Sequence, residues 1–260
     1  MINLLKTKLI LIEGIPGSGK TSAARYTNEW LESNGIKAAL YLEGNLDHPA
    51  DYESVACLNQ QMLEQIAARY PAQWELIQKY STKRSGETFI KFQKMRNDLG
   101  PETIPDDLFH ELGGYEIYNG LSLADFSRVA KDYWAEFTCS AQNEEQIFVF
   151  ECCFLQNPIT NFLGRHNSDL SALSLHLAQT AAVIEPLHPA LVYLDPGDVY
   201  ITLQRAVDTR PTWWYEGLIH YITGQGYGKA YHLEGLSGIA RFYEMMREIQ
   251  VAFLQTWQGP

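Results

Sequence analysis

The sequence has few of the residues that build disulfide frameworks or structural metal sites. It contains four cysteines, Cys57, Cys139, Cys152 and Cys153. They form no CxxC pair, and the seven histidines form no HxH or HxxxH pair. The adjacent Cys152 and Cys153 follow an apolar run, which is typical of buried thiols. These absences disfavour a secreted disulfide scaffold and a protein-ligated zinc site, and a reducing, cytoplasmic location is expected.

Long apolar runs and an excess of basic residues are also missing. No run approaches the roughly 20 apolar residues that span a bilayer, so no membrane partner is predicted. Twenty Lys and Arg residues stand against 31 Asp and Glu residues, which gives a net charge of −11. Such acidity opposes general binding to nucleic acid, and no nucleic acid partner is predicted.

What the chain does have is enough apolar residues for a sizeable core. Hydrophobic residues make up 46% of its 260 residues and charged residues 20%, values that are ordinary for a soluble globular protein. The length indicates a single domain over residues 1–260, with one core that carries a large insertion.

Four short apolar runs are typical of buried strands. Residues 9–12, 38–42, 146–150 and 190–194 are rich in branched and aromatic side chains. A helical pattern over residues 21–33 separates the first two runs, which predicts a β-loop-α-β unit and a parallel sheet. Residues 45–145 lie between the second and third runs and are mostly helical in pattern, with residues 97–120 as a loop. We interpret this segment as a helical insertion, because a plain crossover is much shorter.

The loop after the first strand fits the pattern G-x-x-x-x-G-K-[ST] over residues 14–21, GIPGSGKT. The glycines allow the backbone to curl until several N–H groups point at phosphate oxygens, in front of a helix N-terminus. Lys20 can reach the β- and γ-phosphates, and the hydroxyl of Thr21 can ligate Mg²⁺. The predicted binding residues for the nucleotide, ATP with Mg²⁺, are Gly14, Pro16, Gly17, Ser18, Gly19, Lys20, Thr21 and Ser22.

These residues resemble the phosphate loop of the P-loop NTPases. The DxxG and NKxD motifs of Ras-type GTPases and the LSGGQ motif of ABC ATPases are missing. The pattern looks like the nucleoside and nucleotide kinases of that superfamily, which implies a three-layer α/β fold with a mainly parallel sheet. In that group a mobile LID follows the fourth strand and brings arginines onto the transferred phosphoryl group. Residues 198–230 resemble such a LID, and the resemblance gives Arg205 and Arg210 this role.

Two carboxylates end predicted strands on the same edge of the sheet. Glu43 follows the second strand and Glu151 the third, and in parallel sheets ligands bind outside the carboxyl ends of strands. Glu43 is the preferred general base for an acceptor hydroxyl, with Asp47 as the alternative. Glu151 is expected to orient Mg²⁺, through water or directly, or to bind the acceptor. Gln156 is a further residue that can bind an acceptor or cap the turn there.

The sequence therefore predicts an ATP-binding phosphotransferase, a kinase that transfers the γ-phosphoryl group to a hydroxyl of a small-molecule acceptor. Lys20, Glu43, Arg205 and Arg210 are its expected catalytic residues, and Thr21 and Glu151 its expected metal ligands. The alternative is a nucleotide-dependent ATPase or switch that acts on a protein partner.

Overall fold

The computed structural model describes residues 6–257, so residues 1–5 and 258–260 of the predicted domain lie outside the described part. The chain divides into two compact units. The first combines Met1–Glu43 with Lys131–Pro260, and the second is Gly44–Ala130. The second unit begins close to the start of the predicted insertion, residues 45–145, and ends before the insertion does.

The first unit contains a four-stranded sheet in the order β2-β6-β1-β7. Its strands are β1 (Leu9–Gly14), β2 (Ala38–Tyr41), β6 (Ile147–Glu151) and β7 (Ala190–Leu194). All three strand pairs are parallel. β1 is internal, because Leu11 lies opposite Phe150 of β6 on one side and Leu191 of β7 on the other. The predicted parallel sheet is therefore confirmed.

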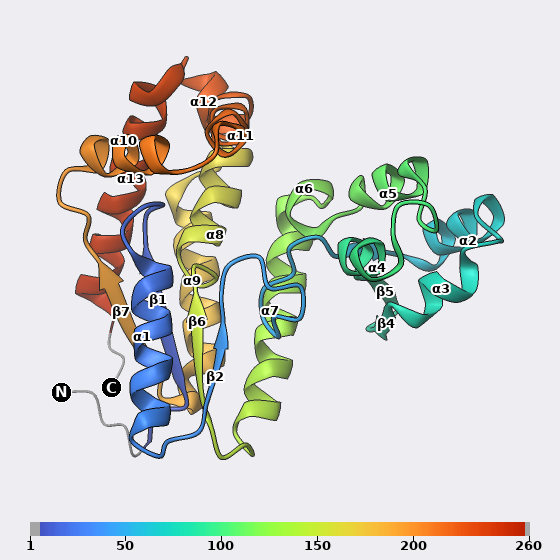
Figure 1. The fold of residues 1–260 in the computed structure, drawn as a ribbon, viewed down its shortest axis with the longest axis horizontal. Coiled ribbons are helices and arrows are strands. Elements are labelled where there is room, and N and C mark those ends of the chain that lie inside the picture. Colours follow the sequence, from blue (N-terminus) through green and yellow to red (C-terminus); the bar gives the residue numbers. More distant parts are fainter. Residues whose placement is uncertain (1–5, 258–260) are drawn as a thin grey trace. The chain divides into compact units, whose positions relative to one another are not determined.

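Helices cover both faces of this sheet (Figure 1). α1 (Lys20–Ser33) connects β1 to β2, and α9 (Leu170–Ile184) lies between β6 and β7, so the two connections cross the sheet in opposite directions. Right-handed crossovers in opposite directions put their helices on opposite faces. On the α1 face, Ile10 and Ile12 pack with Ala24 and Leu31 in one buried cluster. The predicted α/β class is confirmed by this arrangement.

Aromatic side chains form much of the opposite face. Phe148 and Phe150 point there because side chains alternate along a strand. The ring of Phe137, from α7 (Leu123–Ala141), lies 5.0 Å from that of Phe148 and 4.8 Å from that of Phe150. From α13 (Gly235–Thr256), Phe253 contributes a ring 5.7 Å from that of Phe154. These contacts bury the loop that follows β6 against the C-terminal helix.

The region after β7 consists of short helices. α10 (Val199–Thr209), α11 (Thr212–Thr223) and α12 (Gly226–Ala230) occupy most of residues 198–230. Asp198 caps α10 by accepting the N–H of Ile201 at 2.9 Å. Both α10 and α11 pack on α13. Within residues 6–257, the sheet gains no fifth strand from this region.

The second unit differs from the prediction of a mostly helical insertion with a loop over residues 97–120. It contains α2 (Gln60–Arg69), α3 (Trp74–Lys79), α4 (Phe92–Leu99), α5 (Asp106–Gly113) and α6 (Ile117–Gly120). It also contains an antiparallel sheet in the order β3-β5-β4, from β3 (Ala56–Leu58), β4 (Ser81–Arg84) and β5 (Glu87–Ile90). The prediction that residues 97–120 form a loop is wrong, because α5 and α6 lie there.

The missed sheet has a local physical cause. Ser85 and Gly86 both have positive φ angles, 48° and 85°, as two-residue hairpin turns require, and they join two strands of only four residues each. Helical spacing from Val55 onward is interrupted at Asn59, whose side chain accepts the N–H of Met62 and starts α2 there. Strands this short show too few alternations to stand out from a helical pattern.

Among the described residues, none of the helices combines the length and the apolar character needed to cross a membrane.

Candidate functional site

The loop between β1 and α1, called the glycine-rich loop below (residues 14–19), has a backbone that only glycine adopts easily. The φ angles are 149° at Gly14, 85° at Gly17 and 94° at Gly19. A Cβ on Gly14 would lie 2.7 Å from Oγ of Ser18 and 2.8 Å from the carbonyl oxygen of Leu194, so the loop folds tightly over the ends of β1 and β7. α1 then begins at Lys20 without a side-chain cap, which leaves its first N–H groups open to a ligand.

Lys20 lies along the inside of this loop. Its side chain is buried, and Nζ donates a hydrogen bond to the carbonyl oxygen of Ile15 at 2.8 Å. The ammonium group is thus held at the loop rather than in bulk solvent. A lysine in this position adds a positive charge to a ring of N–H donors, which suits an anionic ligand.

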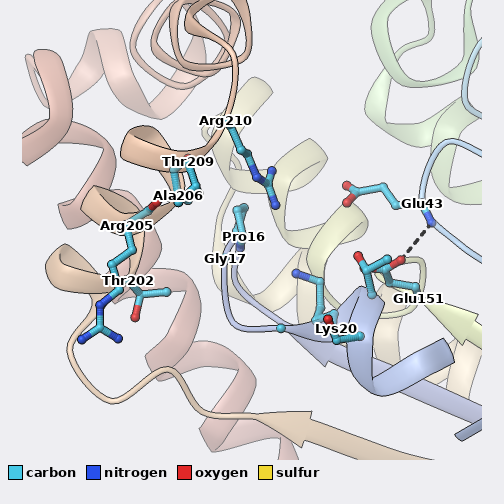
Figure 2. A pocket seen from close by; sticks show the side chains of 13 residues that line it. Pro16, Gly17, Lys20, Glu43, Glu151, Thr202, Arg205, Ala206, Thr209 and Arg210 are labelled. Carbon is cyan, nitrogen blue, oxygen red and sulfur yellow. Dashed lines mark hydrogen bonds between the residues drawn. The ribbon is translucent and has the colours of Figure 1, made fainter. Parts of the chain in front are cut away.

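Thr21 and Glu151 meet at the mouth of the loop. Oγ1 of Thr21 donates to Oε1 of Glu151 at 2.7 Å. The backbone N–H of Glu43 donates to Oε2 of Glu151 at 3.3 Å (Figure 2). Glu151 reaches this point because β6 pairs with β1 in the register Ile12↔Glu151. The chain leaves β1 and β6 in opposite directions across the sheet, so this edge is a topological switch point, where ligands of α/β sheets bind.

Glu43 approaches Glu151 from the end of β2. Its side chain is exposed and accepts a hydrogen bond from Nε2 of Gln156 at 3.1 Å. The thiol of Cys152 donates to its other oxygen at 3.5 Å. Gln156 is buried, and its Oε1 has no hydrogen-bond partner among the described residues. The sequence-predicted carboxylates therefore lie together, with Gln156 beside them.

Asp47, the alternative base, belongs to the second unit. It forms ion pairs there with Lys94 at 2.7 Å and Lys91 at 3.1 Å. The hydrogen bond from Lys94, supported by that from Lys91, lowers the pKa of the Asp47 carboxyl. A carboxylate held in two ion pairs is a weaker proton acceptor than one without them.

A pocket of about 320 Å³ joins the glycine-rich loop, the two carboxylates and one face of α10. It is lined by Pro16, Gly17, Gly19, Lys20, Thr21, Ser22, Glu43, Glu151, Thr202, Arg205, Ala206, Thr209 and Arg210. Of the predicted site residues, Gly14 and Ser18 shape the loop without lining the pocket. Sequence reasoning missed Thr202, Ala206 and Thr209, although their helical spacing with Arg205 gave a signal for one lining face.

Arg205 of α10 and Arg210, which directly follows that helix, are directed differently (Figure 2). Arg210 extends from the helix end toward the space between the glycine-rich loop and Glu43, whereas the guanidinium of Arg205 points away from Lys20. The guanidinium of Arg210 lies over the ring of Trp214, 4.2 Å from its centroid. This cation–π contact restricts the side chain without neutralising its charge.

Glu13, the residue before Gly14, escaped the sequence analysis. Its side chain is fully buried, and its carboxylate accepts the N–H groups of Phe154 at 2.8 Å, Leu155 at 3.0 Å and Gln156 at 3.0 Å. Burial raises the pKa of Glu13 to about 7, although the three N–H groups and nearby Lys20 act to lower it. The sequence signal for a buried carboxylate here was a single acidic residue in the otherwise apolar strand LILIEG.

The oxygen atoms of Thr21, Glu43 and Glu151 are of the kind that binds a hard divalent cation next to an anionic ligand. Ligand atoms of Glu43, Glu151 and Cys152 lie within 4.8 Å of one another. Burial raises the pKa of the Cys152 thiol well above its usual range, which leaves the carboxylate and hydroxyl oxygens as the ligands that fit Mg²⁺. Lys20, Arg205 and Arg210 supply positive charge to the same pocket.

Comparison with protein-family models and with curated proteins gives no match to this chain. The function is therefore inferred from the chemistry of this pocket.

Proposed function

We propose that the first unit binds a nucleoside triphosphate with Mg²⁺ and acts as a kinase on a small-molecule hydroxyl. The observation that carries the proposal is the hydrogen bond between Thr21 and Glu151 at the end of a glycine-rich loop that encloses a buried lysine. Loop, hydroxyl and carboxylate come from separate parts of the chain and meet in one pocket.

The glycine-rich loop would hold the phosphate chain. Its positive-φ glycines and the uncapped start of α1 offer N–H donors, and anions are stabilised at such a terminus. Lys20 would exchange its bond to the Ile15 carbonyl for phosphate oxygens. Because the bond to Ile15 is made by a charged donor to a neutral acceptor, replacement by a charged acceptor is favourable.

Thr21 and Glu151 would hold the metal, and their oxygen atoms fit Mg²⁺ because this ion prefers oxygen ligands and retains several waters. When bound, Mg²⁺ supplies charge neutralisation between neighbouring phosphate oxygens. The direct bond between Thr21 and Glu151 keeps both side chains at one point.

Glu43 would accept the proton of the acceptor hydroxyl. Its carboxylate is exposed to the pocket and is oriented by Gln156, and an oriented carboxylate within hydrogen-bonding reach is what general base catalysis needs. Arg210 would approach the transferred group from the other side, since its guanidinium is directed into this space.

Titration with a non-hydrolysable ATP analogue and Mg²⁺ tests the proposal. We expect micromolar to submicromolar binding by the wild type and loss of binding in Lys20→Ala. Lys37→Ala is the matched control, because Lys37 is an exposed lysine that does not line the pocket. No measurable binding of ATP or GTP analogues by the wild type would overturn the proposal.

A second measurement separates the kinase from an ATPase or switch. ATP consumption is followed with and without mixtures of sugars, polyols and nucleosides. The kinase predicts low consumption that rises when an acceptor is present. Steady hydrolysis that no acceptor changes would favour the nucleotide-dependent switch instead.

A further inference from the structure

The buried carboxylate of Glu13 joins two parts of the site that are far apart in sequence. It stands at the end of β1, directly before the glycine-rich loop, and it accepts three consecutive N–H groups at the end of the turn after β6. This turn, residues 152–156, leads from Glu151 to Gln156. A fully buried carboxylate has a considerable desolvation cost, which is offset here by three N–H donors that an apolar residue would leave without an acceptor.

The turn that Glu13 holds is strained. Cys152 has a φ angle of 68°, which is uncommon for a residue with a side chain. Such conformations persist only where the surrounding structure fixes them. The three hydrogen bonds from Phe154, Leu155 and Gln156 to a single side chain provide that fixation.

Both pocket carboxylates adjoin this turn, and Glu43 is bonded by two of its residues. Glu151 precedes it and bonds Thr21. Gln156 ends it, donates its backbone N–H to Glu13 and its side-chain Nε2 to Glu43. Cys152 begins it and also contacts Glu43 through its thiol. A shift of the turn would therefore move both of these partners of the Glu43 carboxylate together.

We infer that Glu13 is a positioning residue for the proposed transfer site, which fixes the turn of residues 152–156 and thereby orients Glu43 through Gln156. Nothing in this role requires Glu13 to touch nucleotide or acceptor. A glutamine at this position would keep the size of the side chain but offer one acceptor oxygen, and its NH₂ group would face N–H donors.

The experiment compares the wild type with Glu13→Gln by amide hydrogen exchange and by NMR of the Gln156 side-chain NH₂ group, assigned with Gln156→Ala. We expect exchange of the amides of residues 154–156 to be roughly tenfold faster or more, because one of the two acceptor oxygens is lost. We also expect the Gln156 NH₂ resonances to move toward those of a free amide. Affinity for the Mg²⁺-ATP analogue should stay within about threefold of the wild type, because the loop and Lys20 remain.

Glu116→Gln is the matched control, because Glu116 is equally a buried glutamate that accepts a backbone N–H, from Ser54 at 3.0 Å, and it lies in the second unit. Glu116→Gln should leave the exchange rates of the amides of residues 154–156 and the Gln156 NH₂ resonances unchanged. Should Glu13→Gln fail to fold, Glu13→Asp keeps the charge with a shorter reach and should loosen the same amides to a smaller extent.

Unchanged Gln156 resonances and unchanged exchange in the Glu13 variant would overturn the inference. So would equal changes in Glu13→Gln and Glu116→Gln, which would indicate general destabilisation. The inference rests on the proposed function for the meaning of the site, but the two fail separately. Absence of nucleotide binding by the wild type removes the proposed function, whereas exchange and NMR decide the role of Glu13.

Discussion

The hydroxyl of Thr21 lies 2.7 Å from a carboxylate oxygen of Glu151, although 130 residues separate the two in sequence. Their meeting follows from the parallel pairing of β1 with β6, which brings the first turn of α1 next to the end of β6. These two residues are the proposed metal ligands, and the glycine-rich loop and the proposed base line the same pocket.

Removal of the Thr21 hydroxyl should separate metal-dependent from metal-independent binding. Thr21→Val keeps the shape of the side chain, and we expect the gain in ATP-analogue affinity on adding Mg²⁺ to fall by about tenfold, since one oxygen ligand is lost. Thr21→Ser should retain the gain. Titrations with Mg²⁺ and with EDTA measure it, and an undiminished gain in Thr21→Val would contradict the assignment.

Glu43→Gln should keep Mg²⁺-ATP analogue affinity within about threefold and lower acceptor-dependent ATP consumption by roughly 100-fold or more, because a general base is removed while nucleotide contacts remain. Asp47→Asn is the comparison variant, and it should have little effect because Asp47 is engaged with Lys91 and Lys94. Unchanged consumption in Glu43→Gln would exclude Glu43 as the base.

Arg205 and Arg210 should differ in how much they stabilise the transferred phosphoryl group. ADP with aluminium fluoride imitates the transferred phosphoryl group, and we expect Arg210→Ala to weaken its binding relative to ADP alone by about 100-fold. Arg205→Ala should have a clearly smaller effect, because its guanidinium points away from Lys20 (Figure 2). Equal losses in the two variants would show that the direction seen in the pocket does not determine their roles.

Gly17 should tolerate substitution poorly because α10 lies against it. A Cβ there would be 3.2 Å from the carbonyl oxygen of Thr202 and 3.3 Å from Cβ of Ala206. Gly35→Ala is the control, since Gly35 also has a positive φ angle, 74°, but nothing within 4 Å of an added Cβ. In urea unfolding, Gly17→Ala should lower the free energy of unfolding by at least about 1 kcal/mol more than Gly35→Ala does. Similar losses would indicate backbone strain alone.

Glu13 should give the free energy of unfolding a specific pH dependence. Its pKa rises from the ordinary value of 4.5 to about 7 in the folded state, chiefly through burial. The folded protein thus holds a proton that the unfolded chain releases, and this contribution is complete below pH 4.5 and is lost as the pH rises through about 7. Between these limits the wild type should lose up to about 3 kcal/mol relative to Glu13→Gln. Urea unfolding at several pH values measures the difference, and parallel curves would refute it.

Much of the first unit could be predicted because its signals are local. The apolar runs of β1, β6 and β7 and the glycine pattern of residues 14–21 each occupy only a few consecutive residues. Local periodicity and glycine placement therefore dictate their backbone. The small sheet of the second unit escaped prediction because its strands are three or four residues long. Its hairpin turn at Ser85 and Gly86 was the one strong local signal.

The amino-acid order alone thus specified a curled glycine-rich loop next to Lys20 and Thr21, and carboxylates at Glu43 and Glu151. It left open which distant groups these residues meet. The contact of Thr21 with Glu151, the direction of Arg210 and the three N–H bonds to Glu13 depend on strand order, register and helix packing. Strand order, register and helix packing depend on the burial of entire sheet and helix faces by residues far apart in sequence. No short stretch of residues therefore encodes them.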